Sequence, residues 1–424
     1  MAREMKDSGI EWFRKIPVNW KKVAIKRLFE IGRGRVIATT ELSDFGYPVY
    51  SSQTKNNGVL GYIDTYDYDR SQLTWTTDGA NAGTVFLREG KHNCTNVCGT
   101  LMPISETEND LRFLKYIVSF TAFYHKRADI NGFKIMNNEM AEIIIILPPL
   151  KEQHRIADFL DNQCAHIDSV IEKTRSAIEE YKKLKQAVIT QAVTKGIRPN
   201  REMKDSGIEW IGEIPREWRM TKIKVGVSKV GSGKTPSGGA EVYADEGIIF
   251  LRSQNIYDTG IVIDSPTFIT NETDEEMKNT RVQPNDVLLN ITGGSIGRCC
   301  IFPNYLKQAN VNQHVSIVRV IKTIILSEFM HLYWISDLGK MSIQLFQTGG
   351  NREGMTADAI KNSPIAIPDL PEQSEIVAYL DEKTAAIDSL IQKKEQLITE
   401  LEAYKKSLIY EYVTGKKEVP VHAH

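Results

Sequence analysis

Residues 3–12 of this chain recur without a single change as residues 201–210. A second pair of segments, 148–194 and 368–414, repeats through a series of identical residues, with an offset of 220 in place of 198. The stretch between the two repeated segments is therefore 22 residues longer in the second copy, and it shares little sequence with the first. Because tandem copies of one sequence adopt the same fold, the chain is constrained to two related units, each a fixed frame around a variable middle.

Composition excludes few classes of protein. A length of 424 residues with 41% hydrophobic and 25% charged residues suits two or three globular domains. No window approaches the roughly 18 apolar residues of a membrane helix, and no apolar run follows the first residues, so a cytoplasmic protein is expected. The net charge of −1 gives no general attraction to nucleic acid, and any DNA-binding surface must depend on local patches.

The five cysteines do not form a framework that the two copies share. Reduced thiols are therefore the expected state. His92, Cys94 and Cys98 have the residue types of a metal site, but no fourth ligand stands nearby and the second copy has no equivalent set. No metal site is predicted.

The repeated segments that begin at residues 151 and 371 show helical periodicity. Apolar residues fall at sums of three and four, and Lys, Glu and Gln fill many other positions, which predicts long amphipathic helices with coiled-coil-like seams. About 44 residues make a rod of roughly 65 Å, too long to bury its stripe in one small domain. The natural partner is the other helix, in an antiparallel pair with pseudo-twofold symmetry. Two independently packed helices remain the alternative.

The variable middles, about 21–147 and 219–367, mix short β-rich runs with helical stretches near 111–125 and 326–338. This mixture predicts a compact α+β domain in each copy. Local echoes between the middles, such as residues 52–53 with 253–254 and 78–83 with 292–297, indicate a shared fold.

Several of these segments together resemble the specificity subunit of a type I restriction-modification system, over the whole chain. The resemblance rests on Lys-Asp-Ser-Gly-Ile-Glu-Trp ahead of each variable middle, on Gly231-Ser-Gly-Lys-Thr-Pro-Ser237 and Phe250-Leu-Arg-Ser-Gln-Asn255, and on the helix starts Leu147-Pro-Pro-Leu-Lys-Glu-Gln153 and Ile367-Pro-Asp-Leu-Pro-Glu-Gln373. The first middle departs from this pattern, with Gly32-Arg-Gly-Arg-Val-Ile-Ala-Thr39 in place of the Gly-Ser-Gly-Lys segment.

The resemblance implies an α+β fold in which two target-recognition domains each precede a long helix, and the helices pair as a spacer. The corresponding division is 1–147 and 197–367 for the recognition domains with their repeat segments, 148–196 and 368–416 for the helices, and 417–424 for a tail. The resemblance also implies that each domain recognises one half of a split target in double-stranded DNA. Two modification subunits with S-adenosylmethionine and adenine-N6 methylation chemistry, and ATP-dependent restriction subunits, would join the assembly. The chain itself would be non-catalytic and would bind no cofactor.

Motifs for catalysis are missing from the sequence itself. An adenine-N6 methyltransferase needs an Asn/Asp-Pro-Pro-aromatic turn, and Leu147-Pro-Pro-Leu150 lacks both flanking residues. The segment Gly231–Thr235 resembles a P-loop, but the required first glycine is Ser228. No acid pair, nucleophile with its base or metal cluster recurs in both copies.

DNA contacts are predicted from polar side chains near Gly-rich or Asn-rich turns. Arg and Lys pair with guanine, Asn and Gln pair with adenine, and Ser and Thr hold phosphates. In the second domain the candidates are Lys234, Thr235, Ser237, Arg252, Gln254, Asn255, Arg298, Asn312, Gln313 and Arg352. In the first domain they are Arg33, Arg35, Gln53, Lys55, Asn56, Asn81 and Lys134. Solvated loop residues without a DNA contact are the alternative at each position.

The repeated segments 7–12 and 205–210 each follow the end of a long helix in circular order. We expect the chain ends to lie close together, and these segments, with the outer helix faces, to form two equivalent docking surfaces for modification subunits. Packing of their tryptophans against the helix bases is the alternative. A stand-alone DNA-binding regulator or scaffold is the alternative function.

Overall fold

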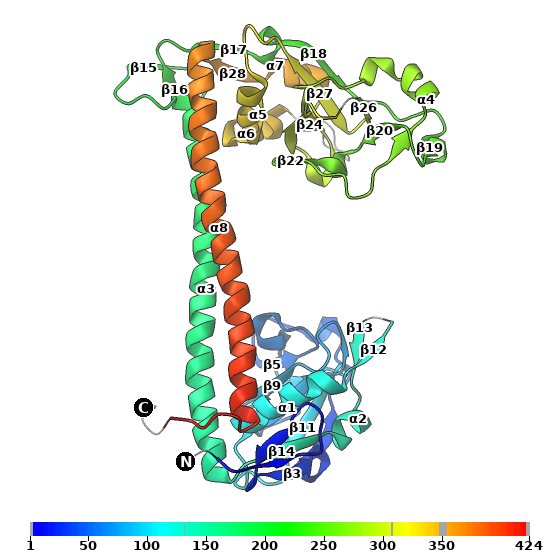
Figure 1. The fold of residues 1–424 in the computed structure, drawn as a ribbon, viewed down its shortest axis with the longest axis vertical. Coiled ribbons are helices and arrows are strands. Elements are labelled where there is room, and N and C mark those ends of the chain that lie inside the picture. Colours follow the sequence, from blue (N-terminus) through cyan, green and yellow to red (C-terminus); the bar gives the residue numbers. More distant parts are fainter. Residues whose placement is uncertain (1–2, 131, 307, 347–353, 421–424) are drawn as a thin grey trace. The chain divides into compact units, whose positions relative to one another are not determined.

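The computed structural model describes residues 3–130, 132–306, 308–346 and 354–420. The chain forms two compact units, Met1–Thr174 with Gln396–His424, and Arg175–Glu395 (Figure 1). Each unit therefore combines one variable domain with half of each long helix, α3 (Leu150–Lys195) and α8 (Leu370–Val413). The predicted five-part division of the chain stays a prediction.

Two sheets form the centre of the first unit. The larger has the order β4-β11-β7-β9 and the smaller the order β10-β5-β6. Their strands are β4 (Phe29–Arg33), β5 (Tyr47–Tyr50), β6 (Val59–Ile63), β7 (Gln72–Thr76), β9 (Val85–Arg88), β10 (Asn93–Cys94) and β11 (Cys98–Pro103). Around them lie β3 (Lys21–Ala24), β8 (Asp78–Gly79), β12 (Arg127–Asp129), β13 (Gly132–Lys134), β14 (Ile144–Leu147), α1 (Leu111–His125) and α2 (Asn137–Glu142).

The second unit repeats this topology. Its larger sheet has the order β18-β27-β24-β25, and its smaller sheet contains β23-β20-β26 with β19 added at the edge. The strands are β17 (Arg219–Lys222), β18 (Val227–Ser232), β19 (Tyr243–Ala244), β20 (Ile248–Leu251), β21 (Ile256–Tyr257), β22 (Gly260–Ile261), β23 (Phe268–Ile269), β24 (Val287–Asn290), β25 (Cys299–Ile301), β26 (Ala309–Val311), β27 (Val315–Val320) and β28 (Pro364–Ile367). The helices are α4 (Asn271–Glu276), α5 (Ser327–Ile335), α6 (Asp337–Phe346) and α7 (Ala357–Asn362). The α+β fold and its repetition are confirmed.

One expected helix is divided in two. The sequence predicts a helix near 326–338, whereas α5 ends at Ile335 and α6 begins at Asp337. The hydroxyl of Ser336 donates to the carbonyl oxygen of Tyr333 at 2.6 Å, and the backbone N–H of Asp337 donates to Thr190 Oγ1 at 3.0 Å. Local side-chain hydrogen bonds of this kind compete with the helical ladder, and they explain the break.

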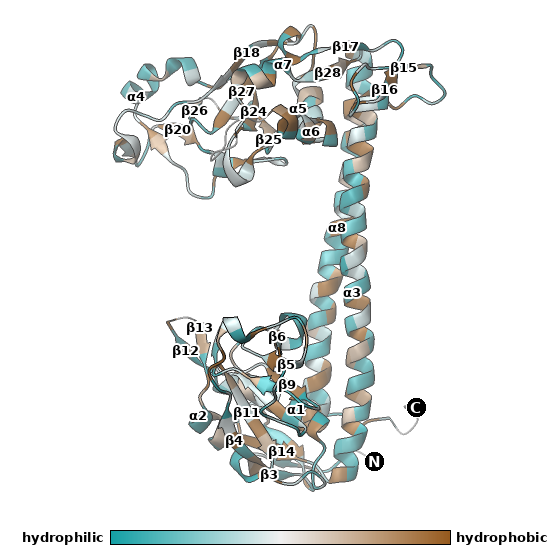
Figure 2. Cartoon of the chain, turned by 180° about the vertical axis from the view of Figure 1, so that it is seen from behind, coloured by the Kyte–Doolittle hydropathy of each residue, from teal (hydrophilic) through white to brown (hydrophobic). Residues whose placement is uncertain are grey.

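The long helices pair antiparallel within each unit. In the first unit, the rings of Phe159 and Tyr412 lie 4.5 Å apart, and early residues of α3 contact late residues of α8. In the second unit, Ile189 near the end of α3 shares a hydrophobic core with Ile376 near the start of α8. Figure 2 shows hydrophobic and hydrophilic residues interspersed along both helices, as a seam with charged flanks requires. No helix in the described part of the chain combines the length and apolar character that crossing a bilayer requires.

The repeat segments form hairpins at the helix bases. Strands β1 (Met5–Asp7) and β2 (Lys15–Pro17) pair in the first unit, and β15 (Met203–Asp205) and β16 (Glu213–Pro215) pair in the second. Behind each hairpin a tryptophan is fully buried, Trp20 at 0% and Trp218 at 1% exposure. Trp20 and Trp218 therefore pack against the helix bases, which is the alternative role that the sequence left open for the tryptophans.

Candidate DNA-binding loop clusters

Strand pairing gathers four loops at one end of the sheets in each domain. In the first domain the end of β4 (Arg33) pairs with Gly99 at the start of β11, which also pairs with Trp75 near the end of β7. We call the loops at this end the first loop cluster, residues 33–41, 51–58, 77–84 and 95–97. Matching strand pairs define the second loop cluster, residues 232–242, 252–255, 291–298 and 312–314.

In each cluster, the loop after the first strand of the larger sheet crosses the neighbouring backbone closely at a glycine. The N–H of Gly34 donates to the carbonyl of Cys98 at 3.0 Å, and the N–H of Gly233 donates to the carbonyl of Val315 at 2.9 Å. A Cβ atom on Gly34 would lie 2.2 Å from the carbonyl oxygen of Cys94, and one on Gly233 would lie 2.0 Å from that of Val311. Only glycine permits this approach, so the Gly-x-Gly segments fix the loops that carry the candidate side chains.

Four first-domain candidates are held by other parts of their domain. Arg33 donates to the carbonyl of Asn96, and Gln53 donates to the carbonyl of Val59. Arg35 Nε lies 3.0 Å from the carboxylate of Asp67. The ammonium of Lys134 lies 3.5 Å from Asp129. The backbone N–H of Ile130 and the charge of Lys134 lower the pKa of Asp129, which therefore stays ionised beside the lysine. Arg33, Arg35 and Gln53 therefore shape the cluster, and Lys134 lies beside it in β13. All four keep only part of their hydrogen-bonding capacity for DNA.

The other three first-domain candidates, Lys55, Asn56 and Asn81, are exposed. Lys55 and Asn56 lie in the 3-10 turn η3 (Lys55–Gly58), where Asn56 has a left-handed backbone with φ of 49°. Asn81 lies between β8 and β9. Their donors and acceptors face solvent, as contacts with DNA require.

In the second domain, five candidates are exposed, and four, Arg252, Asn255, Arg298 and Asn312, are partly or fully enclosed. The exposed side chains are those of Lys234, Thr235, Ser237, Gln254 and Gln313. Asn255 is 8% exposed, accepts from the N–H of Arg252 and donates to the carbonyl of Val262, and Asn312 is equally buried. Asn255 therefore uses both ends of its amide within the domain. Arg252 is half-buried, and its Nε has no partner among the described residues. Arg352 lies outside the described residues.

Sequence analysis missed two residues, His314 in the second loop cluster and Tyr257, which lies beside it in β21. His314 Nδ1 lies 2.6 Å from Thr292 Oγ1, and its Nε2 lies 3.0 Å from the amide of Gln313. Tyr257 lies under Arg298, with 4.7 Å between the guanidinium carbon and the ring centroid. His314 follows the predicted Asn312 and Gln313 directly, but the partner of each lies in another loop, and neither pairing has a sequence signal.

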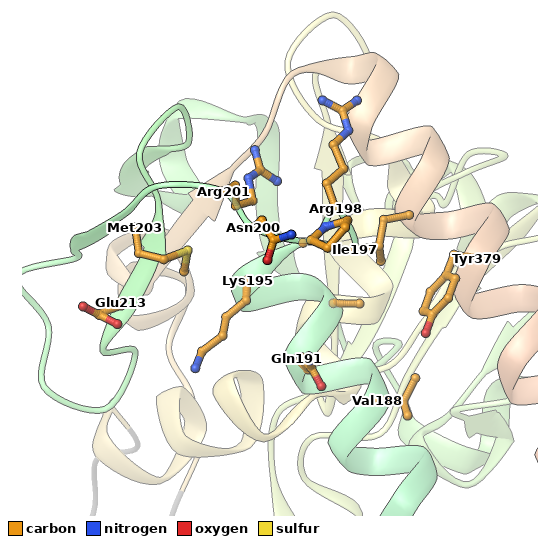
Figure 3. Close-up of a pocket in the computed structure, with 13 residues that line it drawn as sticks. Val188, Gln191, Lys195, Ile197, Arg198, Asn200, Arg201, Met203, Glu213 and Tyr379 are labelled. Atoms are coloured by element: carbon orange, nitrogen blue, oxygen red, sulfur yellow. The ribbon is translucent and has the colours of Figure 1, made fainter.

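A pair of related clefts lies beside the repeat hairpins, one in each unit. In the second unit a cleft of about 400 Å³ is lined by Lys195, Arg198, Arg201 and Tyr379 among others (Figure 3). In the first unit a cleft of about 470 Å³ lies beside Arg3, Glu152 and Arg155. Arg201 contacts Glu372, and Arg3 lies 2.6 Å from Glu152. The hairpin and the helix start are thus joined in the same way twice.

No group of three or more His, Cys, Asp or Glu side chains suited to a metal ion occurs among residues 3–130, 132–306, 308–346 and 354–420. The five cysteines are free and buried. Burial raises the pKa of Cys299 and Cys164, so these two thiols stay protonated and unreactive near neutral pH.

The family model "Type I restriction modification DNA specificity domain" matches residues 17–180 and 215–400. A protein of Mycoplasma pneumoniae named as the N-terminal part of a type I specificity subunit is 40% identical over 145 residues, 33% of this chain and 76% of that protein. A protein of Methanocaldococcus jannaschii named as the specificity subunit of a type I restriction enzyme is 24% identical, over 95% of both chains. A solved structure from work on complex assembly and conformational transition of the type I R-M system shares the fold, with a TM-score of 0.72, 16% identity, and coverage of 95% of this chain and 99% of that chain.

Proposed function

Because the chain belongs to the family of type I restriction-modification DNA specificity subunits, which are non-catalytic DNA-recognition components, we propose that it recognises a split DNA target. One half-site would contact the first loop cluster and the other half-site the second. The long helices would set the number of base pairs between the halves. A subunit with this task acts on host DNA and would work in the cytoplasm.

The observation that carries this proposal is the contrast between backbone and side chains in the two clusters. The strands and the glycine crossings match in both domains. The side chains that they present differ, with Lys55, Asn56 and Asn81 exposed in one domain and Lys234, Gln254 and Gln313 in the other. Amides and cations suit base edges and phosphates, and a different set on the same scaffold suits two different half-sites.

The repeated frame suits two copies of one partner. We propose that two modification subunits dock at the hairpins and outer helix faces, beside the two related clefts. The first unit also presents exposed aromatic side chains at this base, Phe123 at 62% and Tyr124 at 48% exposure. Aromatic residues are enriched in protein interfaces. The modification subunits would carry S-adenosylmethionine, restriction subunits would carry ATP and magnesium, and this chain would carry no cofactor.

The test is co-expression with the neighbouring modification subunit, followed by single-molecule sequencing of host DNA for N6-methyladenine. A split motif that is methylated only when this chain is present is the expected result. The proposal would be contradicted if the unaltered chain bound one unsplit site tightly by itself and no methylation occurred in the presence of its partner. That result would favour a stand-alone regulator.

A further inference from the structure

Arg88 is a charged residue in the interior of the first domain. Its side chain lies at the end of β9, and the residue is 1% exposed. The guanidinium carbon lies 3.6 Å from the ring centroid of Tyr50 and 4.2 Å from that of Phe86. No carboxylate of the described residues forms an ion pair with it. Burial of a cation without a counter-charge is costly, so a charge in this place calls for a role.

The fold does not require a cation at this position. In the first domain, strand pairing sets Arg88 opposite Gln72. In the second domain, the matching pair is Phe302 opposite Asp286, whose carbonyl accepts from the N–H of Phe302, so Phe302 is the counterpart of Arg88. Phe302 is 0% exposed. Arg88 is surrounded by Tyr50, Cys94 and Cys98. Strand pairing shows that their counterparts in the second domain are Leu251, Val311 and Val315, in the same order. An apolar set therefore fills this space in one copy, and a polar, ionisable set fills it in the other.

The polar contacts of Arg88 lead to the first loop cluster. Its Nη1 donates to the carbonyl oxygen of Asn57 at 2.7 Å, and its Nε donates to Thr74 Oγ1 at 3.0 Å. Nη2 is buried and has no partner among the described residues. A Cβ atom on Gly58 would lie 2.8 Å from Nη2, so the absence of a side chain there lets the guanidinium lie directly beneath the turn.

The turn above Arg88 has an unusual backbone. Asn56, Asn57 and Gly58 have φ of 49°, 51° and 79°, three consecutive left-handed residues. Asn and Gly adopt this conformation more readily than other residues, but they ordinarily do so singly, and a run of three depends on contacts that hold it in place. In the second domain, the matching connection between β20 and β23, residues 252–267, has a positive φ only at Gly260, and the buried residue there is Phe302. The run of three left-handed residues and the buried arginine thus occur together in one copy and are both missing from the other.

We propose that Arg88 is a specificity-determining positioning residue, which clamps the left-handed turn 56–58 so that Lys55 and Asn56 face the half-site of the first domain. This inference rests on the proposed function, because it assigns a residue to DNA recognition by the first loop cluster. Arg88 itself is buried and acts through the turn. Loss of the clamp would free the turn to adopt other conformations, and discrimination between bases would fall before overall binding is lost.

Arg88→Phe tests the proposal, because phenylalanine is the residue that the second domain tolerates at the matching place. The variant is co-expressed with the modification subunit, and the methylated motif is compared with that of the unaltered chain. The expected result is a loss of about tenfold or more in preference for the correct base at one or more positions of the first half-site. The second half-site should be unchanged and serves as an internal control. Arg70→Phe, which removes an exposed arginine of the same domain, is the matched control variant and should leave both half-sites unchanged.

An unchanged motif in both halves would overturn the proposal, and so would an equal loss in both halves, which indicates general destabilisation. If Arg88→Phe does not yield folded protein, Gly58→Ala disturbs the same contact from the side of the turn and is judged by the same two criteria. Absence of any split motif with the unaltered chain would instead overturn the proposed function.

Discussion

The guanidinium of Arg3 lies 2.6 Å from the carboxylate of Glu152, and Arg201 and Glu372 form the same ion pair in the second unit. The arginines are separated by 198 residues and the glutamates by 220. Each pair therefore joins the hairpin before a variable domain to the helix after it. The 22 additional residues of the second domain are accommodated elsewhere, so the frame is independent of the length of the domain that it encloses.

Glu372→Ala should lower the free energy of unfolding of the second unit by about 1.5–3 kcal/mol, because it leaves the buried Arg201 with only the exposed carboxylate of Glu217, 3.1 Å away, as a partner. The Arg201 and Glu372 side chains are 10% and 4% exposed. Urea denaturation followed by circular dichroism measures the change. Lys185→Ala is the control, since it removes an exposed pair with Asp388 and should cost at most about 1 kcal/mol. Equal losses in the two variants would show that burial does not decide the effect.

Gly415→Ala should destabilise the base of α8 by more than Gly207→Ala destabilises the second hairpin. Both glycines have a left-handed backbone, with φ of 70° and 73°. A Cβ atom on Gly415 would lie 2.6 Å from the ring of Pro17, whereas one on Gly207 would meet no atom within 4 Å. The backbone alone costs on the order of 1 kcal/mol, and a steric clash adds about 1–3 kcal/mol. Thermal unfolding of the two variants provides the comparison, and indistinguishable melting temperatures would contradict the steric argument.

Asp110→Asn should reduce stability at pH 7 but not at low pH. Asp110 caps α1 by accepting from the N–H of Arg112 at 2.8 Å, and it also accepts from Arg112 Nη2 and His154 Nδ1. Burial raises the pKa of Asp110, but the hydrogen bonds from His154 and Arg112 outweigh it and lower the pKa below its ordinary value. A lowered pKa contributes stability above the unfolded value of about 4, and this contribution is lost as the pH falls through the folded pKa.

Asparagine keeps the capping oxygen, so this substitution isolates the charge. The difference between the two proteins should be about 1–2 kcal/mol at pH 7 and should shrink below about pH 4. Urea denaturation at a series of pH values measures it. A difference that does not change with pH would exclude the carboxylate charge as its cause.

Lys234→Ala and Gln254→Ala should weaken DNA binding by the assembled complex in different ways. A lysine that contacts a phosphate contributes about 0.9 to the slope of log affinity against log salt, whatever the sequence. A glutamine that pairs with adenine contributes about 1–3 kcal/mol of discrimination and no salt dependence. Both side chains are exposed in the second loop cluster. Salt titrations with matched and mismatched half-sites separate the effects. An unchanged salt slope for Lys234→Ala would show that Lys234 does not contact a phosphate.

The frame could be predicted from the sequence because its signals are local or repeated. Glycines with a left-handed backbone end both helices, Gly196 with φ of 72° and Gly415 with φ of 70°. Apolar residues at helical spacing define α3, and the exact repeat shows that whatever structure the first hairpin adopts, the second adopts as well. The resemblance to type I specificity subunits, which depends on these same segments, is confirmed by the family comparison.

The loop clusters could be predicted only as sets of polar residues near turns. The sequence contains Asn255 and Gln254 side by side, but the structure buries the first and exposes the second. Arg35 is held by Asp67, 32 residues further along the chain. A polar group remains available for DNA only if no partner from a distant segment binds it. Strand pairing decides which segments meet, and the periodicity of the sequence does not contain this information.

Repetition and hydrophobic spacing were enough to predict two copies and two long amphipathic helices, because both signals act over neighbouring residues. The burial of Arg88 beneath a turn of three left-handed residues follows from the folded packing alone, since an arginine in a short strand is ordinarily exposed. The free energy of a charged side chain depends on the atoms that surround it. At Arg88 those atoms come from Tyr50, Thr74 and Asn57, and only the folded sheets bring them together.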